Sequence, residues 1–414
     1  MKFDEPRVST SPRVNPYWWP PAMIGRQLAS VGLVGILSRW KGLPDWIVRH
    51  GTRLLPGAAG SIGMGCIGFP NHPVWEVTAK CNLDCIHCHV AGRPVGPELT
   101  TQEGKELLDQ LADVREFRMM AFTGGEPLVR DDIFELLNYS RDLGFNNTLA
   151  TNATMVDDAS ARRLRDSGVG IAAVSLDGMR GTHDTIRGSG AFDAAVSGIR
   201  SLRQAGIPLQ INVTAMGLNL KQIRDVVALS EDLGASIILV YQLVPVGDGQ
   251  TIAESVLTRE QNESLVELMA EIQGSCRAVI EPVAGPQYWS YLLHERGIQG
   301  GPLLEIAGRL FHGCAAGRGF VYIKADGEIL PCPFIETTCG NVRETPFGTI
   351  WESSPVLAKL RDREKSLKGR CGACVYRTVC GGCRGRAQAM TGDYMEEDPC
   401  CFLDLPRGKD GAET

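Results

Sequence analysis

The chain has 414 residues, of which 43% are hydrophobic and 22% charged, and its net charge at pH 7 is −6. This composition is typical of a folded globular protein, and it excludes an intrinsically disordered or a membrane-spanning chain. The sequence has no basic stretch, which argues against nucleic acid as the main partner. The length predicts two or three domains, or one large α/β body with an appendage.

Residues 1–70 are interpreted as an N-terminal extension with helical, amphipathic character. The first residues are polar and lack the apolar core of a secretory signal, so a cytoplasmic location is predicted. Residues 17–68 are rich in Trp, Leu, Ile, Gly and Arg, but their longest apolar run is about ten residues, half of what a bilayer span needs. Two interpretations stay open: a helical cap packed on the main domain, or a segment lying peripherally on a membrane.

From residue 74 onward, apolar runs typical of strands alternate with helical patterns. A capping box of Thr100 and Glu103 precedes one of these helices. Four other helical patterns end at glycines suited to a left-handed C-cap: Gly144, Gly168, Gly206 and Gly234. The strands are expected at 74–78, 117–122, 147–151, 170–176, 209–215 and 236–242. The pattern predicts an α/β fold over residues 71–300, a partial (β/α)6 barrel of the TIM type with its chemistry at the carboxyl ends of the strands.

The first group of cysteines directly follows the first predicted strand. Cys81, Cys85 and Cys88 form a Cys-x3-Cys-x2-Cys loop. Because the fourteen cysteines are bunched rather than spread, metal ligation in a reducing compartment is favoured over disulfides. Three thiolates at this spacing can hold three irons of a [4Fe–4S] cluster and leave the fourth iron open. The alternative is a zinc site completed by His87 or His89.

Polar and glycine residues follow three further strands of the predicted barrel. Each alone has a structural reading as a turn, a core hydroxyl or a surface charge. At successive strand ends, however, they predict one pocket for a small zwitterion with ribose-like hydroxyls. These residues are Gly124, Gly125, Glu126 and Pro127 after the second strand, Ser175, Asp177 and Arg187 after the fourth, and Asn212 in the fifth.

The cysteine loop and the Gly-Gly-Glu-Pro run at 124–127 resemble those of the radical S-adenosylmethionine (SAM) enzymes, over about residues 74–243. The resemblance implies that the open iron binds the amino and carboxylate groups of SAM. It further implies that one-electron reduction yields a 5′-deoxyadenosyl radical, which abstracts a hydrogen atom from the substrate. An electron donor such as flavodoxin or ferredoxin is implied with it.

The same resemblance assigns roles to the pocket residues. The run at 124–127 would contact the methionyl amine. Ser175 and Arg187 would hold the carboxylate side of SAM, and Asp177 and Asn212 would contact the ribose or the methionyl group. No catalytic residue beyond these contacts is predicted.

Nine cysteines follow residue 313. Only five residues separate the two Cys-x2-Cys pairs of this region, which is too few for a zinc ribbon. The pattern over residues 301–414 instead resembles the SPASM domain, which carries one or two auxiliary [4Fe–4S] clusters. It departs from that pattern in having two residues rather than three between Cys380 and Cys383.

This second resemblance implies two ligand sets. One is Cys371, Cys374, Cys380 and Cys401, with Cys401 preferred over Cys400. The other is Cys314, Cys332 and Cys383, with Cys339 as a fourth ligand or the position left open for substrate. Cys66 and Cys276 lack ligand spacing and are interpreted as buried core thiols.

The C-terminal pattern is most similar to the haem-pathway branch of these enzymes, which implies an oxidoreductase that decarboxylates or trims side chains of a tetrapyrrole. Two other classes of function stay open. The second is a maturase of a ribosomal peptide, or an enzyme that functionalises a C–H bond of a lipid at the membrane surface. The third is a non-enzymatic iron–sulfur carrier or scaffold.

Overall fold

The computed structural model describes residues 72–93, 95–114, 117, 119–273, 275–276, 278–310 and 313–403. The predicted N-terminal extension, with both of its interpretations and with Cys66, lies outside the described residues. Within these ranges, no helix combines the length and the apolar character that crossing a membrane requires.

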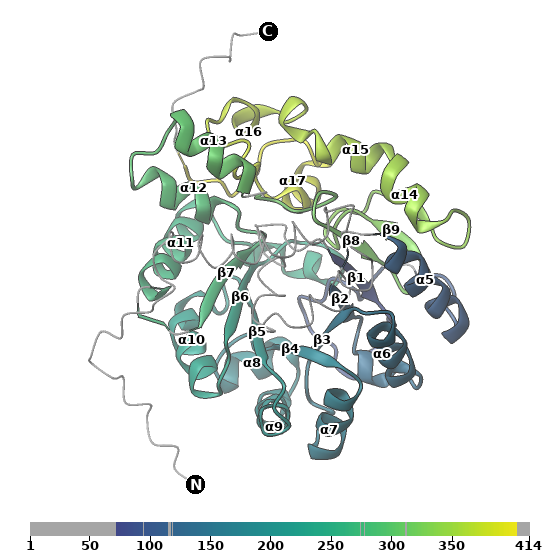
Figure 1. The fold of residues 1–414 in the computed structure, drawn as a ribbon. Helices are drawn as coiled ribbons and strands as arrows, with labels where there is room; N and C mark the ends of the chain where they lie inside the picture. Colours follow the sequence, from purple (N-terminus) through teal and green to yellow (C-terminus); the bar gives the residue numbers. More distant parts are fainter. Residues whose placement is uncertain are drawn as a thin grey trace.

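One sheet of ten strands forms the centre of the described chain, in the order β10-β9-β8-β1-β2-β3-β4-β5-β6-β7 (Figure 1). Strands β8, β1 and β2 to β7 pair in parallel, and β9 and β10 are antiparallel additions beyond β8. The order has two free ends, so the barrel is open. The strands are β1 (His72–Glu76), β2 (Met119–Thr123), β3 (Asn146–Thr151), β4 (Val169–Ser175), β5 (Leu209–Ala215), β6 (Ile237–Gln242), β7 (Val279–Val283), β8 (Phe320–Ile323), β9 (Glu328–Leu330) and β10 (Gly340–Asn341).

Every parallel connection from β1 to β8 contains at least one helix, and Figure 1 shows these helices around the outside of the curved sheet. This is the arrangement of repeated βα units. The helices are α5 (Thr101–Asp113), α6 (Ile133–Asp142), α7 (Asp158–Asp166), α8 (Arg180–Arg187), α9 (Ala191–Gln204), α10 (Ile223–Asp232), α11 (Arg259–Gln273), α12 (Gln287–His294) and α13 (Gly301–Leu310).

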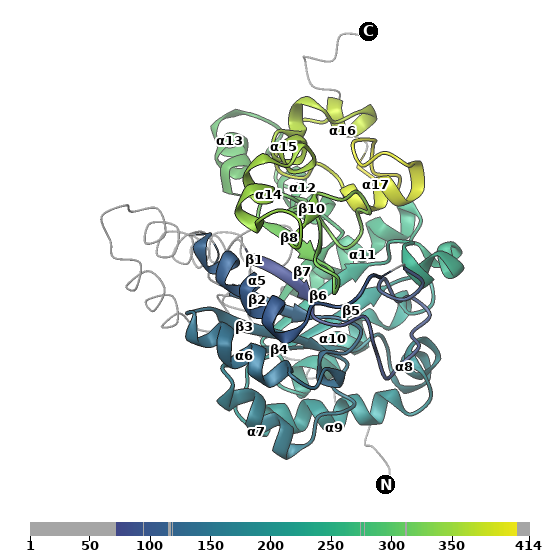
Figure 2. The ribbon, with the colours of Figure 1, turned by 90° about the vertical axis from the view of Figure 1, so that its right-hand side faces the viewer.

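The chain after β8 builds a smaller helical region that Figure 2 shows stacked on one end of the barrel. Strand β8 joins it to the barrel, because Tyr322 of β8 lies opposite Val74 of β1 in the parallel register. The C-terminal region therefore shares the sheet of the barrel. Its helices are α14 (Phe347–Ser353), α15 (Pro355–Arg361), α16 (Gly369–Ala373) and α17 (Arg384–Thr391).

Local sequence signals explain where the elements begin and end. At the start of α5, the Glu103 amide donates to Thr100 Oγ1 (3.3 Å) and the Thr100 amide donates to a Glu103 carboxylate oxygen (2.8 Å), so the predicted capping box is confirmed. The predicted glycine caps have the positive φ that L side chains disfavour. Their φ values are +99° at Gly144, +82° at Gly168, +82° at Gly206 and +93° at Gly234.

Side chains along each strand point alternately to the two faces of the sheet, so one set faces the outer core and the other faces the barrel interior. Trp75 points outward and is fully buried, close enough to α5 that a side chain at Gly104 would collide with it. Its neighbours Val74 and Glu76 point to the opposite face, inside the barrel. The main hydrophobic core therefore lies between the sheet and the outer helices, and the interior holds polar groups such as Glu76 beside a small apolar cluster that contains Val74.

The predicted fold class is confirmed, and the six predicted strands correspond to β1 to β6. The structure adds β7, which the sequence pattern did not predict. Strand β7 contains Pro282 and the buried Glu281, and proline together with an internal carboxylate disfavours a strand assignment. It lies at an end of the sheet, where a missing N–H is tolerated.

Candidate functional site

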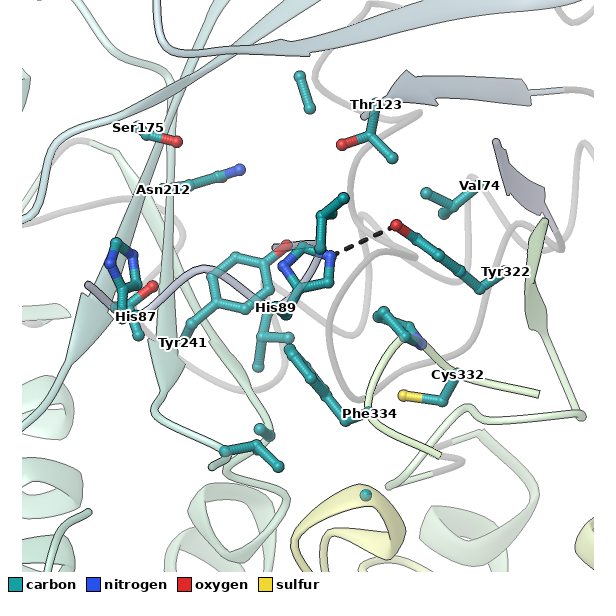
Figure 3. A pocket seen from close by; sticks show the side chains of 18 of the residues that line it. Val74, His87, His89, Thr123, Ser175, Asn212, Tyr241, Tyr322, Cys332 and Phe334 are labelled. Atoms are coloured by element: carbon teal, nitrogen blue, oxygen red, sulfur yellow. Dashed lines mark hydrogen bonds between the residues drawn. The ribbon is translucent and has the colours of Figure 1, made fainter. Parts of the chain in front are cut away.

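A cavity of ≈ 280 Å³ opens at the carboxyl ends of the barrel strands, beneath the C-terminal region. Figure 3 shows side chains from β1, β2, β4, β5, β6 and β8 around it. Two sets of cysteines from opposite ends of the sequence reach this cavity. They are Cys81, Cys85 and Cys88 on one side and Cys314, Cys332 and Cys383 on the other.

The loop after β1 presents the first three cysteines. Backbone amides donate to two of these sulfurs, from Leu83 to Cys81 (3.4 Å) and from Ala91 to Cys88 (3.4 Å). Such N–H···S contacts stabilise negative charge on a thiolate, and they tune iron–sulfur clusters. The three thiols therefore fit the ligand set expected for the SAM cluster.

The Gly-Gly pair after β2 lies against the chain that leads into this loop. The Gly125 amide donates to the Thr78 carbonyl (2.8 Å). A Cβ at Gly125 would lie 2.2 Å from the Lys80 carbonyl, and one at Gly124 would lie 2.5 Å from that of Thr78. The glycines are thus required by the approach of two backbone segments, and both also line the cavity.

Glu126 and Pro127 do not line the cavity. The Glu126 carboxylate is fully buried and accepts hydrogen bonds from the Thr151 hydroxyl (2.8 Å) and from the Asn152 amide (2.7 Å). It thereby ties the end of β2 to the end of β3. Burial raises the pKa of Glu126 even though these donors oppose the shift.

Asp177 also lies one layer behind the cavity wall, where it holds Arg187. Arg187 Nε donates to Asp177 Oδ2 (2.5 Å), and the other carboxylate oxygen accepts from the Thr214 amide (2.7 Å). Burial acts to raise the pKa of Asp177, but Arg187 and His87 outweigh it, so the pKa lies below its ordinary value. Arg187 lines the cavity and reaches Cys85 Sγ (3.7 Å).

Ser175 and Asn212 line the cavity as expected, on neighbouring strands β4 and β5 (Figure 3). The Asn212 side-chain oxygen accepts from Gln210 (2.8 Å), which fixes its amide. The structure therefore brings together Gly124, Gly125, Ser175, Arg187 and Asn212 at the cavity.

His87 and His89 flank Cys88 and both line the cavity. Burial lowers the pKa of His87 to about 4 and that of His89 to about 3, so both imidazoles are neutral at pH 7. Within the described residues, no group of three or more His, Cys, Asp and Glu side chains surrounds a single point in the way a metal ion requires.

The cysteines of the C-terminal region fall into two neighbouring groups. Burial raises the pKa of Cys332 well above its usual value, and Cys314 and Cys383 add to the shift. Burial likewise raises the pKa of Cys380, and the thiols that add to it belong to a separate set. That set is Cys371, Cys374 and Cys401.

Three further cysteines stand apart from these groups. Burial raises the pKa of Cys339 to about 11, and its charged neighbours are Arg361 and Glu328 rather than other cysteines. The carbonyl of Cys400 accepts from Asn262 of α11 (2.8 Å). Cys276 is 1% exposed and belongs to the main hydrophobic core.

Sequence reasoning missed several polar residues of the site. Asn152, at the end of β3, reaches Asn82 of the cysteine loop (2.8 Å). Tyr241 and Tyr322 line the cavity from β6 and β8. The one available signal was Glu76, a carboxylate that directly follows the apolar residues Val74 and Trp75 at the end of β1. Tyr322 lies in another region of the chain, and no sequence pattern predicts the pairing of β8 with β1.

Comparison with known proteins places these features in context. Residues 75–230 match the model of the radical SAM superfamily, and residues 314–375 match SPASM, an iron–sulfur cluster-binding domain. The chain is 39% identical to the AdoMet-dependent heme synthase of Methanosarcina barkeri, over 81% of this chain and 98% of that protein. It is 33% identical to the Fe-coproporphyrin III synthase of the same organism, over 80% of this chain and 85% of that protein.

Solved structures share the fold at lower sequence identity. SuiB of Streptococcus suis, in its complex with S-adenosylmethionine, has a TM-score of 0.65 and 19% identity, covering 92% of this chain and 89% of SuiB. Peptide maturases are more distant relatives in sequence than the heme-pathway synthases.

Proposed function

Because this chain belongs to the radical SAM superfamily and carries a SPASM iron–sulfur cluster-binding domain, we propose that it oxidatively decarboxylates a propionate side chain of a tetrapyrrole. The relatives that support this substrate class are named as heme and Fe-coproporphyrin III synthases. The observation that carries the proposal is the single cavity that both cysteine sets reach.

The ligand sets proposed for the clusters follow the three groups of thiols. Cys81, Cys85 and Cys88 would hold the cluster that binds SAM, and the remaining sets would hold two auxiliary clusters. The auxiliary set that lines the cavity has three cysteines. Its fourth position would be open, since the charged neighbours of Cys339 are not cysteines. The auxiliary sets are Cys314, Cys332 and Cys383, and Cys371, Cys374, Cys380 and Cys401.

The residues of the chain itself would bind SAM and orient it. Gly124 and Gly125 would present backbone to the methionyl group of SAM, and Ser175 and Asn212 would contact its carboxylate or ribose. Arg187, fixed by Asp177, would meet the carboxylate of SAM. Glu126 and Pro127 would support this wall from behind. Flavodoxin or ferredoxin is the electron donor that we expect.

When bound, the first cluster and SAM supply a 5′-deoxyadenosyl radical that takes one hydrogen atom from the substrate. Removal of a hydrogen from the carbon attached to the ring leaves a substrate radical two carbons from its carboxylate. Breaking the bond to that carboxylate releases carbon dioxide, forms a vinyl group and leaves one electron. The cavity then needs an electron acceptor on its far side, and Cys314, Cys332 and Cys383 line that side.

The charge of the cavity wall also favours loss of carbon dioxide. Arg187 is the only Asp, Glu, Lys or Arg among the described residues that line the cavity, and it lies beside Cys85 of the first cysteine set, where it pairs with Asp177. A carboxylate near the auxiliary cysteines would therefore be desolvated without an ion pair. Such an environment destabilises the charged group relative to neutral carbon dioxide.

The test is an anaerobic reaction of the reconstituted protein with SAM, a reductant and iron coproporphyrin III. We expect a product that has lost carbon dioxide and two hydrogens per reacted side chain, formed in step with 5′-deoxyadenosine. SAM cleavage with an intact porphyrin would contradict the proposed substrate class. Loss of two hydrogens from a ribosomal peptide in place of porphyrin turnover would favour a maturase.

A further inference from the structure

A chain of three hydrogen-bonding side chains runs from the barrel interior to the cavity. The Tyr322 hydroxyl on β8 lies 2.6 Å from Glu76 Oε2 on β1. The same hydroxyl lies 3.4 Å from His89 Nε2 (Figure 3). Glu76 and Tyr322 are each 1% exposed. The Tyr322 hydroxyl donates to the Glu76 carboxylate, and burial nevertheless raises the pKa of Glu76.

His89 lies between the two cysteine sets that reach the cavity. It directly follows Cys88, and its ring packs edge-on against Tyr322 (6.0 Å between ring centroids) and Phe334 (5.7 Å). Phe334 is two residues from Cys332. The ring of His89 is thus held by aromatic contacts on the auxiliary side of the cavity.

Among the residues that the structure describes, one ring nitrogen of His89 has a polar partner. Nε2 faces the Tyr322 hydroxyl, whereas Nδ1 makes no hydrogen bond to any residue that the structure describes. A partner at one nitrogen of a neutral imidazole fixes the tautomer and orients the other nitrogen. Nδ1 is therefore available to a molecule in the cavity.

The neighbouring guanidinium, that of Arg93, is not part of the cavity wall. Arg93 donates to the Pro333 carbonyl (2.5 Å) and pairs with Glu336 (3.0 Å), and it does not line the cavity. The polar groups that line the cavity near the auxiliary cysteines include His89 and the Tyr241 hydroxyl.

We propose that His89 contacts the carboxyl group of the substrate through Nδ1, and that Tyr322 and Glu76 are positioning residues that hold its ring. The inference rests on the proposed function, because it takes a propionate as the reacting group. Through one ring nitrogen, the imidazole orients the carboxyl group by a single hydrogen bond. His89 is then a specificity determinant for substrates that carry a carboxyl group at this distance from the macrocycle.

The experiment measures binding to the reconstituted protein without reductant, so that no turnover occurs. Iron coproporphyrin III is titrated and its Soret band gives the Kd for wild type, His89→Phe, His89→Asn and Tyr322→Phe. Each titration is repeated with the iron porphyrin in which ethyl groups replace the propionates. His294→Asn and Tyr139→Phe, on the outer surface of the barrel region, are the matched controls.

We expect His89→Phe to raise the Kd for iron coproporphyrin III about tenfold and Tyr322→Phe about threefold, as the loss of one hydrogen bond and of its support would do. His89→Asn should recover most of the affinity, because its amide lies near the place of Nδ1. For the ethyl porphyrin, all variants should bind within about twofold of wild type, since the contact that they remove is absent.

Two results would overturn the inference alone: an unchanged Kd in His89→Phe, or an equal loss of affinity for both porphyrins. Failure of the wild type to bind or convert iron coproporphyrin III would instead overturn the proposed function, and the inference with it. If His89→Phe does not assemble its first cluster, Tyr322→Phe keeps the ring contacts and decides the question by the same comparison.

Discussion

The two cysteine regions of this chain differ in exposure and in the charge that surrounds them. In the loop after β1, Cys81 is exposed and Cys85 and Cys88 are partly buried, whereas Cys371, Cys380 and Cys383 are buried. Cys81, Cys85 and Cys88 open onto the cavity, as do Cys314, Cys332 and Cys383, whereas the set of Cys371, Cys374, Cys380 and Cys401 does not line it and forms the enclosed region. A cofactor that must meet SAM needs the first environment, and one that only stores or passes electrons tolerates the second.

Buried cations make the contrast sharper. Arg187 is the guanidinium at the first site, and the buried Asp177 balances it. The auxiliary region holds three arginines that are at most 1% exposed, Arg363, Arg384 and Arg386, and among them lies the buried Asp398. Positive charge near an iron–sulfur cluster favours its reduced form. The auxiliary clusters are therefore expected to accept electrons more readily than the cluster at the cavity loop.

The largest expected effect comes from the open region. Replacement of Cys81, Cys85 or Cys88 by alanine should abolish SAM cleavage, because each removes one of the three thiolates proposed to hold the first cluster. The measurement is 5′-deoxyadenosine formed under reducing, anaerobic conditions. Iron analysis should find the auxiliary clusters still bound. Retained cleavage in any of the three variants would refute the assignment.

The enclosed region should respond to loss of its ion pair by losing stability. Asp398 accepts from Arg386 twice, at 2.8 Å each, and from the Cys383 amide at 2.8 Å. Asp398→Ala leaves the buried guanidinium of Arg386 without its carboxylate partner. This should lower the free energy of unfolding by about 3–5 kcal/mol. Anaerobic guanidinium denaturation measures the change.

A surface ion pair provides the control for this prediction. Asp393 pairs with Lys368 at 2.6 Å on the outside of the same region, so Asp393→Ala should cost at most about 1 kcal/mol. Equal shifts in the two variants would mean that the enclosed pair is not structural.

Arg384 tests the electrostatic half of the comparison. Its guanidinium donates to Cys371 Sγ (3.6 Å) and to the carbonyls of Tyr394 and Glu396. Arg384→Gln should lower the reduction potential of the auxiliary cluster proposed at Cys371 by on the order of 100 mV. A redox titration followed by electron paramagnetic resonance gives the potential. Arg224→Gln, on α10 of the barrel, should leave the reduction potential unchanged. An equal shift in this control would contradict the proposed role of Arg384.

The smallest effect is expected behind the open site. Asp177→Asn keeps the shape of the side chain but removes the charge that fixes Arg187. The KM for SAM should rise about tenfold, because a charge-assisted hydrogen bond is lost. Initial rates of 5′-deoxyadenosine formation at varied SAM measure it. Asp193→Asn, exposed on α9, should match wild type, and a KM for Asp177→Asn within twofold of wild type would refute the positioning role.

The sequence predicted the barrel well because its signals are local. The strands β1 to β6 have apolar patterns, and capping glycines and a capping box mark the helix ends. Strand β7 escaped prediction because Glu281 and Pro282 contradict a strand pattern. The pairing of β8 with β1 depends on contacts between distant parts of the chain, which no short motif encodes.

The sequence also allowed us to predict which residues lie near the site, but it did not allow us to predict how their side chains are oriented. A strand-end motif places a residue near the cavity, whereas packing decides whether its side chain turns inward. Glu126 and Asp177 turn away to bind backbone amides and Arg187. His89 and Tyr322 turn inward because their rings pack on one another.

The pairing of β8 with β1 has a consequence for synthesis of the chain. Glu76 and Tyr322 are 246 positions apart, so at about 5–20 residues per second the edge of β1 waits on the order of ten seconds or longer for its partner. An unpaired edge can recruit a strand from another chain and aggregate. A chain that ends before β8 should therefore be insoluble even though β1 to β7 are all present.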